Sequence, residues 1–481
     1  MQIKLVTKVL GILLMIFSIS MLPPIIVSII FSDNEVWSFL YALFFILLAG
    51  SLMWFPTMQV NENMKLRDGF IVVVLFWIVL SLCGALPLIL SENVFMSYTD
   101  AFFESVSGLT TTGATIFSDL TNVPESILFY RQYLQWLGGL GIIVLAIAIL
   151  PTLGIGGMQL YKAEVAGPLK NKLTPRITET AKALWFIYFL LTLTCMLLYW
   201  LAGMSLFDAI CHSFSTISIG GFSTHNDSFE FFNNHFIEIV AIVFMLLASL
   251  NFSLHYLAFS KFSIKPYIQD KECNYFFYII LFITSISVLY FFQNTHIVDY
   301  NKIIKNVFQS VSIVTTTGFT NSSYGHFIGF LPIFLILFSF IGGCAGSTAG
   351  GMKVIRFSLL IKQGNRELKK LLHPNGKFNV RLGESLVNQR MMETVWGFFA
   401  VYISVFIIVM MLLMYSGLDL ETSFSAVAAT INNLGPGLGE VVNGYNNLSD
   451  FNKWLLSFSM IVGRLEVFTL LVILTPEFWR K

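Results

Sequence analysis

The sequence predicts an all-α membrane protein in which one unit is repeated four times behind two additional N-terminal helices. Composition is the first observation: 56% of the 481 residues are hydrophobic and only 11% are charged, with a mean hydropathy of +0.77. A surface built from such residues must largely face lipid. The second observation is a glycine-containing motif that returns at intervals of roughly 100 residues, as internal repeats do.

The motif places hydroxyl, amide or apolar residues directly before a glycine. Its four copies are Ser105-Val-Ser-Gly-Leu-Thr-Thr-Thr-Gly-Ala-Thr115, Ser213-Phe-Ser-Thr-Ile-Ser-Ile-Gly-Gly-Phe-Ser223, Ser310-Val-Ser-Ile-Val-Thr-Thr-Thr-Gly-Phe-Thr320 and Ala429-Thr-Ile-Asn-Asn-Leu-Gly-Pro-Gly437. In the first and third copies a serine stands eight positions before the glycine. The same step from Ser213 selects Gly221 rather than its neighbour Gly220 in the second copy.

Such a motif suits an alkali cation that has lost its water. Backbone carbonyl groups aimed at an axis replace the hydration shell, and glycine permits the backbone angles that turn them inwards. One segment cannot enclose an ion, whereas four segments around a pseudo-fourfold axis can. The alternative is that Thr-Thr-Gly and Ser-Gly are ordinary turn signals in loops. Four copies, each between two apolar spans, make that the weaker interpretation.

Apolar runs long enough to cross a bilayer, about 20 residues each, predict ten spans. They cover residues 8–31, 38–58, 69–91, 129–150, 182–202, 235–259, 275–292, 328–360, 392–416 and 453–475. Each motif copy lies between two of the last eight runs and is opened by a half-spanning pore helix, with Asp100 and Asp208 suited to two helix N-termini. We therefore expect two N-terminal spans in 1–66 and repeated units in 67–160, 161–270, 271–385 and 386–481.

The distribution of basic residues predicts the orientation in the membrane. All 28 lysines and arginines except Arg131, Lys302, Lys305, Lys453 and Arg464 fall at the termini or in loops on one side. That side is therefore expected to be cytoplasmic and to hold both termini, with the first apolar run as an uncleaved span. The basic segment 356–390 on this side either serves orientation alone or docks a cytosolic partner.

The apolar run at 328–360 is interrupted by Gly342-Gly-Cys-Ala-Gly-Ser-Thr-Ala-Gly-Gly351. Each glycine in a helix costs roughly 1 kcal/mol relative to alanine, so this stretch disfavours a continuous helix. Gly342, Gly346 and Gly350 stand four apart and provide, as an alternative, a helix-packing face. Because two adjacent glycines at each end exceed what a packing face needs, we expect a flexible loop beneath the repeated motifs.

Arg464 is predicted to lie inside the last apolar run, at a cost of about 2.5–3.5 kcal/mol on insertion scales. Glu466 is two positions away and points to another face of the helix, so it is a poor partner. Two interpretations stay open. Either carbonyl groups of a neighbouring helix satisfy the arginine, or its charge limits the passage of a cation beside it.

These motifs resemble those of the Trk/Ktr/HKT superfamily of potassium-translocating subunits, and most closely those of its bacterial TrkH/TrkG branch. The resemblance rests on the four motif copies, on Gly342–Arg356 and on Gly463-Arg-Leu-Glu-Val-Phe-Thr-Leu470, which together span almost the whole chain. It implies potassium uptake across the bacterial inner membrane, with the glycine-rich loop as a gate. It also implies a homodimer and a cytosolic regulatory subunit whose Rossmann domains bind NAD or ATP.

The resemblance also assigns residues to the ion path. The potassium filter comprises Thr111, Thr112, Gly113, Ile219, Gly220, Gly221, Thr316, Thr317, Gly318, Asn433, Leu434 and Gly435. The gate comprises Gly346, Ser347, Thr348, Ala349, Gly350 and Arg464. Potassium is the transported substrate, and no covalently bound cofactor is expected.

Other functions fit the sequence less well. A sodium-permeable relative, or one that couples potassium to protons or sodium, shares the architecture; in the resembling superfamily a serine in place of a filter glycine accompanies sodium permeation, and here all four positions are glycine. The sequence has no His-Glu-x-x-His, no phosphate loop ending in Gly-Lys-Ser/Thr and no Gly-x-Ser-x-Gly elbow, so an enzyme is not expected. A net charge of +1 gives no indication of nucleic-acid binding. No chain of buried carboxylates indicates a proton relay, which favours passive conduction.

Overall fold

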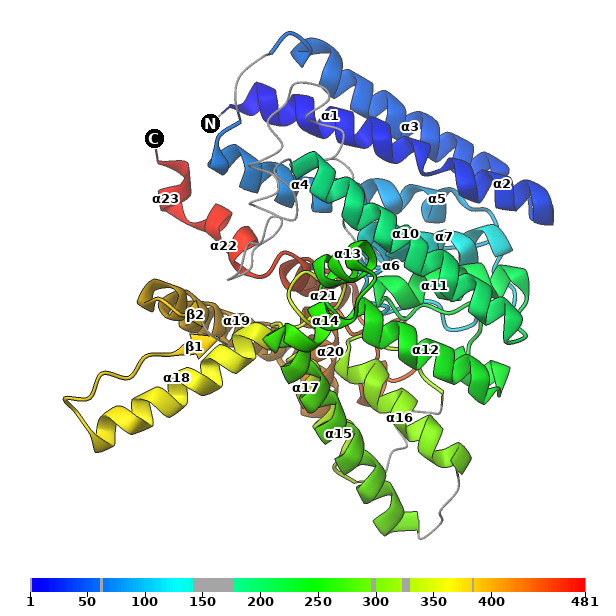
Figure 1. The fold of residues 1–481 in the computed structure, drawn as a ribbon. Coiled ribbons are helices and arrows are strands. Elements are labelled where there is room, and N and C mark those ends of the chain that lie inside the picture. The colour runs from blue at the N-terminus through cyan, green and yellow to red at the C-terminus, as the bar shows by residue number, and fades with distance from the viewer. Residues whose placement is uncertain are drawn as a thin grey trace.

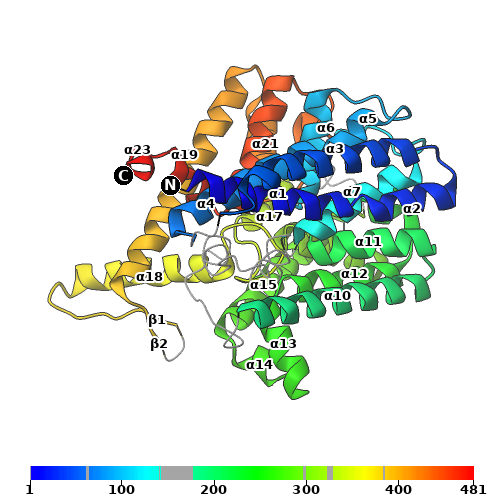
Figure 2. The same ribbon diagram turned by 90° about the horizontal axis from the view of Figure 1, so that it is seen from above.

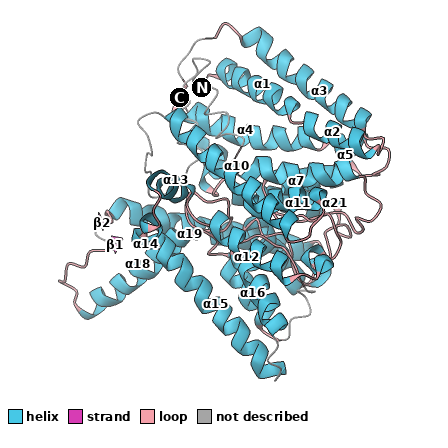
Figure 3. Ribbon diagram, turned by 45° about the vertical axis from the view of Figure 1, so that its right-hand side comes forward, coloured by secondary structure: helices cyan, strands magenta, loops and turns pink. Residues whose placement is uncertain are grey.

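The computed structural model of the protein describes residues 2–60, 64–139, 141, 177–295, 300–321, 329–382 and 385–480. Helices dominate these ranges (Figure 3). Within them, the strands β1 (Arg381–Leu382) and β2 (Ser385–Leu386) form one short antiparallel ladder. The two ends of the chain lie close together at one end of the molecule (Figures 1 and 2).

The N-terminal region is a long helical hairpin. Helices α1 (Ile3–Ile19) and α2 (Leu22–Phe31) pack against α3 (Val36–Trp54), which continues into the 3-10 turn η1 (Phe55–Thr57). A Cβ on Gly11 of α1 would lie 2.7 Å from the carbonyl oxygen of Gly50 in α3. These glycines therefore let the two backbones approach closely, as small residues do between membrane helices.

The next part of the chain contains α4 (Leu66–Gly84), α5 (Leu86–Leu90), α6 (Tyr98–Leu109) and α7 (Glu125–Gly139). The Ser97 hydroxyl accepts a hydrogen bond from the Asp100 N–H and so caps α6, with Asp100 in the first turn as predicted. Helix α6 is about 18 Å long, roughly half the bilayer core. The rest of the predicted span 129–150 and the loop before residue 177 lie outside the described residues, apart from Gly141.

Helix α10 (Ile177–Leu201) precedes α11 (Leu206–Ser218), the 3-10 helix η3 (Ser228–Phe232), α12 (His235–Ala248), α13 (Phe252–Lys261) and α14 (Lys265–Gln269). Ser205 caps α11, and Asp208 lies in its first turn, as in α6. The predicted span over 235–259 is not one continuous helix, because the chain bends by 98° between α12 and α13. Asn251 stands at this break and caps α13 with its side chain.

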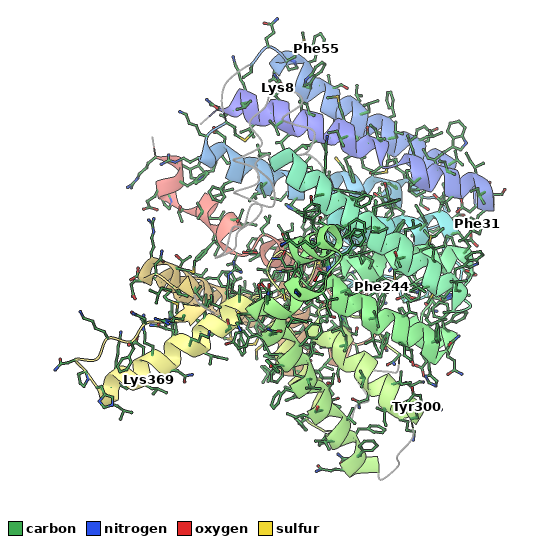
Figure 4. All side chains as sticks on the ribbon, viewed as in Figure 1. Lys8, Phe31, Phe55, Phe244, Tyr300 and Lys369 are labelled. Carbon is green, nitrogen blue, oxygen red and sulfur yellow. The ribbon has the colours of Figure 1, made fainter. Side chains whose placement is uncertain are left out.

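The following region contains α15 (Lys271–Thr295), α16 (Tyr300–Val314), α17 (Leu331–Ser339) and α18 (Val354–Leu372). The run at 328–360 is interrupted as predicted, since α17 ends at Ser339 and α18 begins at Val354. Helix α18, together with the strands after it, projects from the body of the molecule (Figures 1 and 2). Lys369 lies near its far end (Figure 4).

The C-terminal part comprises α19 (Gln389–Tyr415), α20 (Leu420–Ile431), the 3-10 turn η5 (Gly439–Val441), α21 (Asp450–Arg464), α22 (Phe468–Leu474) and α23 (Pro476–Trp479). The predicted span 453–475 is also not continuous, because α21 and α22 meet at 114°. Glu466 and Val467 lie between them with φ of 55° and 53°. Left-handed backbone at a β-branched valine is an uncommon, strained conformation.

Six described helical stretches are long and apolar enough to cross a membrane, or eight when each of the two bent pairs counts as one span. Their outward faces are apolar; Phe45 of α3, Leu281 of α15 and Ile408 of α19 are at least half exposed. The helices between them are more polar and buried, as in α6, where every residue from Ala101 to Leu109 is buried. This arrangement fits lipid outside and protein inside, and it confirms the prediction of an all-α membrane protein.

Candidate ion-binding site

Four short turns share one backbone conformation. Each follows the C-terminus of α6, α11, α16 or α20 and consists of a left-handed residue, a middle residue outside the left-handed region, and a left-handed glycine. We call them glycine turns 1 to 4: residues 111–113, 219–221, 316–318 and 433–435. The left-handed residues are Thr111 and Gly113 (φ 56° and 83°), Ile219 and Gly221 (57° and 81°), Thr316 and Gly318 (66° and 82°), and Asn433 and Gly435 (54° and 97°). These turns contain all twelve residues of the predicted filter.

The turns arise from the way the four helices end. In each turn the N–H of the middle residue donates to a carbonyl group five residues earlier in the preceding helix, which is the Schellman type of helix ending. The pairs are Thr112 with Ser107 (2.8 Å), Gly220 with Ser215 (2.8 Å), Thr317 with Ser312 (2.8 Å) and Leu434 with Ala429 (2.7 Å). Because left-handed backbone costs residues with a Cβ roughly 1–2 kcal/mol, the surroundings must hold the first residue of each turn in place.

The four turns close into a ring. A Cβ on each left-handed glycine would meet the carbonyl oxygen of the middle residue in the adjacent turn, at 2.6 Å or less. The pairs run from Gly113 to Gly220, from Gly221 to Thr317, from Gly318 to Leu434 and from Gly435 back to Thr112. Each turn therefore touches the next, and turn 4 touches turn 1. Segments more than 300 residues apart in the sequence meet in this ring.

The register of the second turn follows from the same geometry. Gly221, and not Gly220, has the left-handed conformation that Gly113, Gly318 and Gly435 share. This agrees with the register given by the spacing from Ser213. Gly220 lacks a side chain for another reason, because a Cβ there would lie 2.4 Å from the side-chain amide of Gln135.

Hydroxyl and amide side chains support the turns in different ways. In turns 1 and 3, the middle threonine shares a hydrogen bond with the threonine two residues before it, at 2.7 Å for Thr110–Thr112 and 2.8 Å for Thr315–Thr317. In turn 4, the Asn433 amide donates to the Thr112 hydroxyl (2.9 Å) and to a carbonyl of α21. Side-chain hydrogen bonds therefore reach across the ring as well as within single turns.

A second set of side chains fixes the chain segments that follow the turns. Glu104 in α6 accepts from the Ile116 N–H (2.8 Å), and His212 in α11 bonds the Ser223 hydroxyl (2.9 Å). Gln309 in α16 and Ser425 in α20 accept from backbone N–H groups of Asn321 and Leu438. Each helix thus holds the chain both before and after its own glycine turn.

The charge count set Arg131, within the predicted run 129–150, apart from the basic side of the molecule. Arg131 lies within α7 with 1% of its surface exposed. Its Nε atom donates to Glu104 at 2.7 Å, and a second nitrogen donates to the Thr115 hydroxyl at 2.9 Å. The guanidinium group also lies over the Phe222 ring, 4.3 Å from its centroid. Arg131 therefore joins the chain segments that follow turns 1 and 2.

Five of the six predicted gate residues, all except Arg464, lie in an irregular loop, residues 340–353, that we call the glycine-rich loop. Gly342, Gly346, Gly351 and Lys353 have positive φ, which a helix-packing face does not allow. The segment is therefore an irregular loop and not a helix-packing face. Thr348, Gly350 and Gly351 form hydrogen bonds with the ring or with the chain just before it.

The loop contacts turn 3 directly and also contacts the chain just before turns 2 and 4. The Thr348 hydroxyl donates to the Ile217 carbonyl in α11 (2.9 Å), and the Gly350 N–H donates to the Thr316 hydroxyl (2.8 Å). A Cβ on Gly350 would lie 1.9 Å from the Asn432 carbonyl oxygen, just before turn 4. Of the other predicted gate residues, Gly346 accepts from the Phe252 N–H, Ser347 donates to the Cys344 carbonyl and Ala349 accepts from Lys353.

Arg464 connects the loop to turn 1. It lies at the C-terminal end of α21, at the bend, rather than inside a continuous span. Its guanidinium group donates to the Thr348 carbonyl (3.1 Å), the Thr111 hydroxyl (3.3 Å) and two carbonyls at the end of α7, Gly138 (2.5 Å) and Gly139 (2.8 Å). A cation at a helix C-terminus is also favoured by the helix dipole.

Further ionic groups hold the ends of the loop, and the sequence analysis did not identify them. Glu272 in α15 accepts from the N–H groups of Ala345 (2.7 Å) and Ile355 (3.2 Å). Arg356, at the start of α18, forms an ion pair with Glu466 in the bend between α21 and α22. Glu466 is therefore a partner of Arg356 rather than of Arg464.

Among the described residues, no group of three or more His, Cys, Asp or Glu side chains has an arrangement that could hold a metal ion. The oxygen atoms gathered at the ring belong instead to carbonyl groups, hydroxyls and amides, which are ligands for hard cations such as alkali ions. Irregular backbone of this kind is tolerated at membrane depth only inside protein or beside a water-filled path. The fold and the ring define a multi-pass membrane protein with a polar, backbone-lined centre.

Comparisons with known proteins place the chain within that class. The family model of the TrkH cation transport proteins matches residues 37–481. The Trk system potassium uptake proteins TrkH of Vibrio parahaemolyticus and Escherichia coli are 50% and 49% identical, each over 100% of both chains. The crystal structure of the potassium transporter TrkH from Vibrio parahaemolyticus superposes with a TM-score of 0.91 and 48% identity over 100% of both chains. The chain belongs to the TrkH family of cation transport proteins.

Proposed function

We propose that the protein is the potassium-translocating subunit of a Trk-type uptake system and that glycine turns 1 to 4 form its selectivity filter. The closed ring of left-handed glycines, each against a carbonyl oxygen of the adjacent turn, is the observation that carries the proposal. Carbonyl oxygens around an axis replace the hydration shell of potassium. The names of the relatives, which are potassium uptake proteins and not enzymes, agree with this assignment.

The proposed topology has ten spans. Eight come from the six long helical stretches and the two bent pairs. The other two are the predicted runs 129–150, which lies partly outside the described residues, and 328–360, which contains α17. Two spans fall in 1–66, and four units of span, pore helix, glycine turn and span fall in 67–160, 161–270, 271–385 and 386–481. The shared hydrogen-bond pattern of the four turns supports this division.

We further propose that the glycine-rich loop and Arg464 form an intramembrane gate on one side of the filter. The loop is supported in this role by its hydrogen bonds to α11 and turn 3, its contact before turn 4 and its link through Arg464 to turn 1. A segment tied to all four quarters of the ring is well placed to obstruct a central path. Its glycines supply the backbone freedom that a moving segment needs.

The proposed location is the bacterial inner membrane with both termini in the cytoplasm. The positive-inside rule and the adjacent positions of the two termini support this orientation (Figure 2). A homodimer and a cytosolic Rossmann-type subunit that binds NAD or ATP complete the proposal. Helix α18 and its basic side chains, which project from the body, are the docking surface we assign to that subunit.

Potassium uptake tests the function directly. The chain, expressed in a bacterial strain without its own potassium transporters, is expected to restore growth at low potassium. Purified protein in liposomes is expected to pass potassium faster than sodium. Equal rates for the two ions would replace the proposal with the sodium-permeable alternative, and failure to pass either ion would overturn it.

A further inference from the structure

Gln135 in α7 touches glycine turn 2 with both ends of its side-chain amide. Its Nε2 atom donates to the Gly220 carbonyl at 2.6 Å, and its Oε1 atom accepts from the Phe222 N–H at 3.2 Å. The side chain is completely buried. Gln135 therefore fixes the two peptide groups on either side of Gly221. It does so from α7, which follows turn 1 in the sequence.

The contact explains why turn 2 has two consecutive glycines. Gly220 occupies the middle position of the turn, which is threonine in turns 1 and 3 and leucine in turn 4. It has no positive φ and so has no conformational need to be glycine. A Cβ at Gly220 would instead lie 2.4 Å from Cδ and Oε1 of Gln135. The amide of Gln135 fills the space that the middle side chain fills in the other turns.

In turns 1 and 3 the middle residue has a hydroxyl that bonds the residue just before the turn. Thr112 and Thr317 each pair with the hydroxyl of the threonine two residues earlier. In turn 2 the residue two positions before Gly220 is Ser218, whose hydroxyl donates instead to the Ser215 carbonyl at 3.3 Å. Turn 2 thus has a hydroxyl two positions before its middle residue, as turns 1 and 3 do, but Gly220 has no hydroxyl to pair with it. The polar group beside Gly220 is instead the side-chain amide of Gln135 in α7.

We propose that Gln135 is a specificity-determining positioning residue, which does for turn 2 what Thr112 and Thr317 do within their own turns. The inference rests on the proposed function, because it assumes that the ring is the selectivity filter. Selection between potassium and sodium depends on the size of the oxygen cage and on the number and field of its carbonyl dipoles. By holding the Gly220 carbonyl, Gln135 keeps one quarter of the cage from contracting around the smaller ion.

A set of variants at the two contacting positions tests this assignment. Gln135→Leu preserves the bulk but removes both hydrogen bonds, and Gln135→Glu retains only the acceptor for the Phe222 N–H. Gly220→Thr alone places a side chain against Gln135. Gln135→Ala with Gly220→Thr removes that clash and puts a hydroxyl beside Ser218, as in turn 1. Gln132→Leu is the matched control, because Gln132 is equally buried one turn earlier in α7 and no partner of its amide is found among the described residues.

The measurement is the potassium-to-sodium permeability ratio of purified full-length protein in lipid bilayers, taken from reversal potentials. We expect Gln135→Leu and Gln135→Glu to lower the ratio by about tenfold. A change of this size corresponds to the net free energy of about one or two hydrogen bonds. Gly220→Thr is expected to abolish flux, the double variant to recover a ratio near that of the wild type, and Gln132→Leu to leave the ratio unchanged.

The outcomes separate this inference from the function on which it rests. A wild-type protein that passes no potassium contradicts the proposed function. A selective wild type with an unchanged ratio in both Gln135 variants overturns the role of Gln135 alone, as does an equal loss in Gln132→Leu. If Gln135→Leu does not fold, the near-isosteric Gln135→Glu and the double variant decide, since the ratio of an open pore does not depend on the amount of folded protein.

Discussion

Gly113, Gly221, Gly318 and Gly435 are each held by two separate constraints. Their φ angles lie between 81° and 97°, where residues with a Cβ are strained. The space that a Cβ would take is already occupied by a carbonyl oxygen of the adjacent turn. A side chain at any of them therefore strains its own backbone and also displaces a neighbouring carbonyl group, which is the group proposed to bind the ion.

Gly113→Ser is expected to relax potassium selectivity over sodium. The added side chain would push the Gly220 carbonyl, 2.2 Å from the position of its Cβ, out of the ring. Permeability ratios in bilayers measure the effect. Gly203→Ser is the control, because Gly203 also has a positive φ of 107° but nothing lies within 4 Å of its Cβ position. An unchanged ratio in well-expressed Gly113→Ser protein would remove Gly113 from the ion path.

Arg464→Ala is expected to raise potassium flux, because it removes a positive charge and the hydrogen bonds that tie the loop to turn 1. At an effective dielectric constant of about 20, two unit charges about 8 Å apart repel by roughly 2 kcal/mol. That barrier corresponds to roughly 30-fold in rate if it limits passage. Arg464→Lys keeps the charge but not the planar fork, so its flux should stay nearer to that of the wild type.

Uptake normalised to folded protein, together with the thermal unfolding temperature, separates the two interpretations of Arg464. If the arginine only ties carbonyl groups of α7 to the loop, both substitutions should lower stability, with alanine the more severe. Reduced uptake and a lower unfolding temperature in Arg464→Ala would contradict a role in limiting flux.

At the scale of single elements, the glycine-rich loop is the irregular segment through which several helices are connected. It is joined to α15 by Glu272, to α11 by Thr348 and to α21 by Arg464. The Arg356–Glu466 ion pair ties the start of α18 to the strained bend after α21. The start of α18 is therefore linked to both the loop and the bend.

Deletion of residues 346–350 is expected to raise basal potassium flux per folded molecule, since it removes the proposed obstruction. The hydrogen bonds from the loop to Ile217 and Thr316 would be lost with it. Flux should be measured against the amount of folded protein in the same membranes. Low expression with no gain in flux per molecule would indicate that the segment serves packing instead.

The helices that carry the turns could be predicted, whereas the bends could not. Ser97 with Asp100 and Ser205 with Asp208 are recognisable helix starts, and the motif marks the helix ends. The breaks near Asn251 and after Arg464 fall inside apolar runs, so hydropathy does not register them. Polar residues at those breaks, such as Asn251 as a cap and Arg464 as a donor to carbonyl groups, are the local signals.

The support behind the ring was missed for a related reason. Counting charges assigns each cation to one side of the membrane, and it does not reveal that Arg131 is buried. Yet α7 contains three polar residues close together, Arg131, Gln132 and Gln135. Such a set indicates a helix that is buried among other helices rather than exposed to lipid. Which carbonyl each side chain reaches depends on pairings between distant segments, which one sequence does not reveal.

The buried pair Glu104–Arg131 gives a prediction about the junction of the first two units. Glu104→Gln leaves the Arg131 charge buried without its partner, which typically costs about 3–5 kcal/mol. We expect a marked fall in the thermal unfolding temperature in detergent. The double variant Glu104→Gln, Arg131→Met should recover much of the loss, because no unpaired charge remains. A double variant less stable than Glu104→Gln would contradict this account.

At the scale of the whole molecule, hydrogen bonds between the chain segments that follow the turns also join neighbouring quarters of the ring. The Tyr445 N–H donates to the Thr115 carbonyl (2.8 Å), and the Phe229 N–H donates to the Thr320 carbonyl (2.9 Å). Asn226 donates to Asp119 (2.7 Å). Hydrogen bonds from Thr121 and Asn226 lower the pKa of Asp119 from 3.8 to about 2, so this tie is present above pH 4 and is lost as the pH falls through about 2.

We expect the protein to conduct potassium passively, without coupling to a second ion. The glycine turns themselves consist of backbone and uncharged side chains, and the buried carboxylates of Glu104 and Glu272 each accept hydrogen bonds from structural partners. A membrane potential of 100 mV contributes about 2.3 kcal/mol per charge, enough for roughly a 40-fold potassium gradient without a coupled ion. We therefore predict that, in liposomes clamped at zero potential, an imposed proton gradient drives no net potassium accumulation, whereas an imposed potential does. Potassium accumulation driven by the proton gradient alone would show that the protein is a symporter.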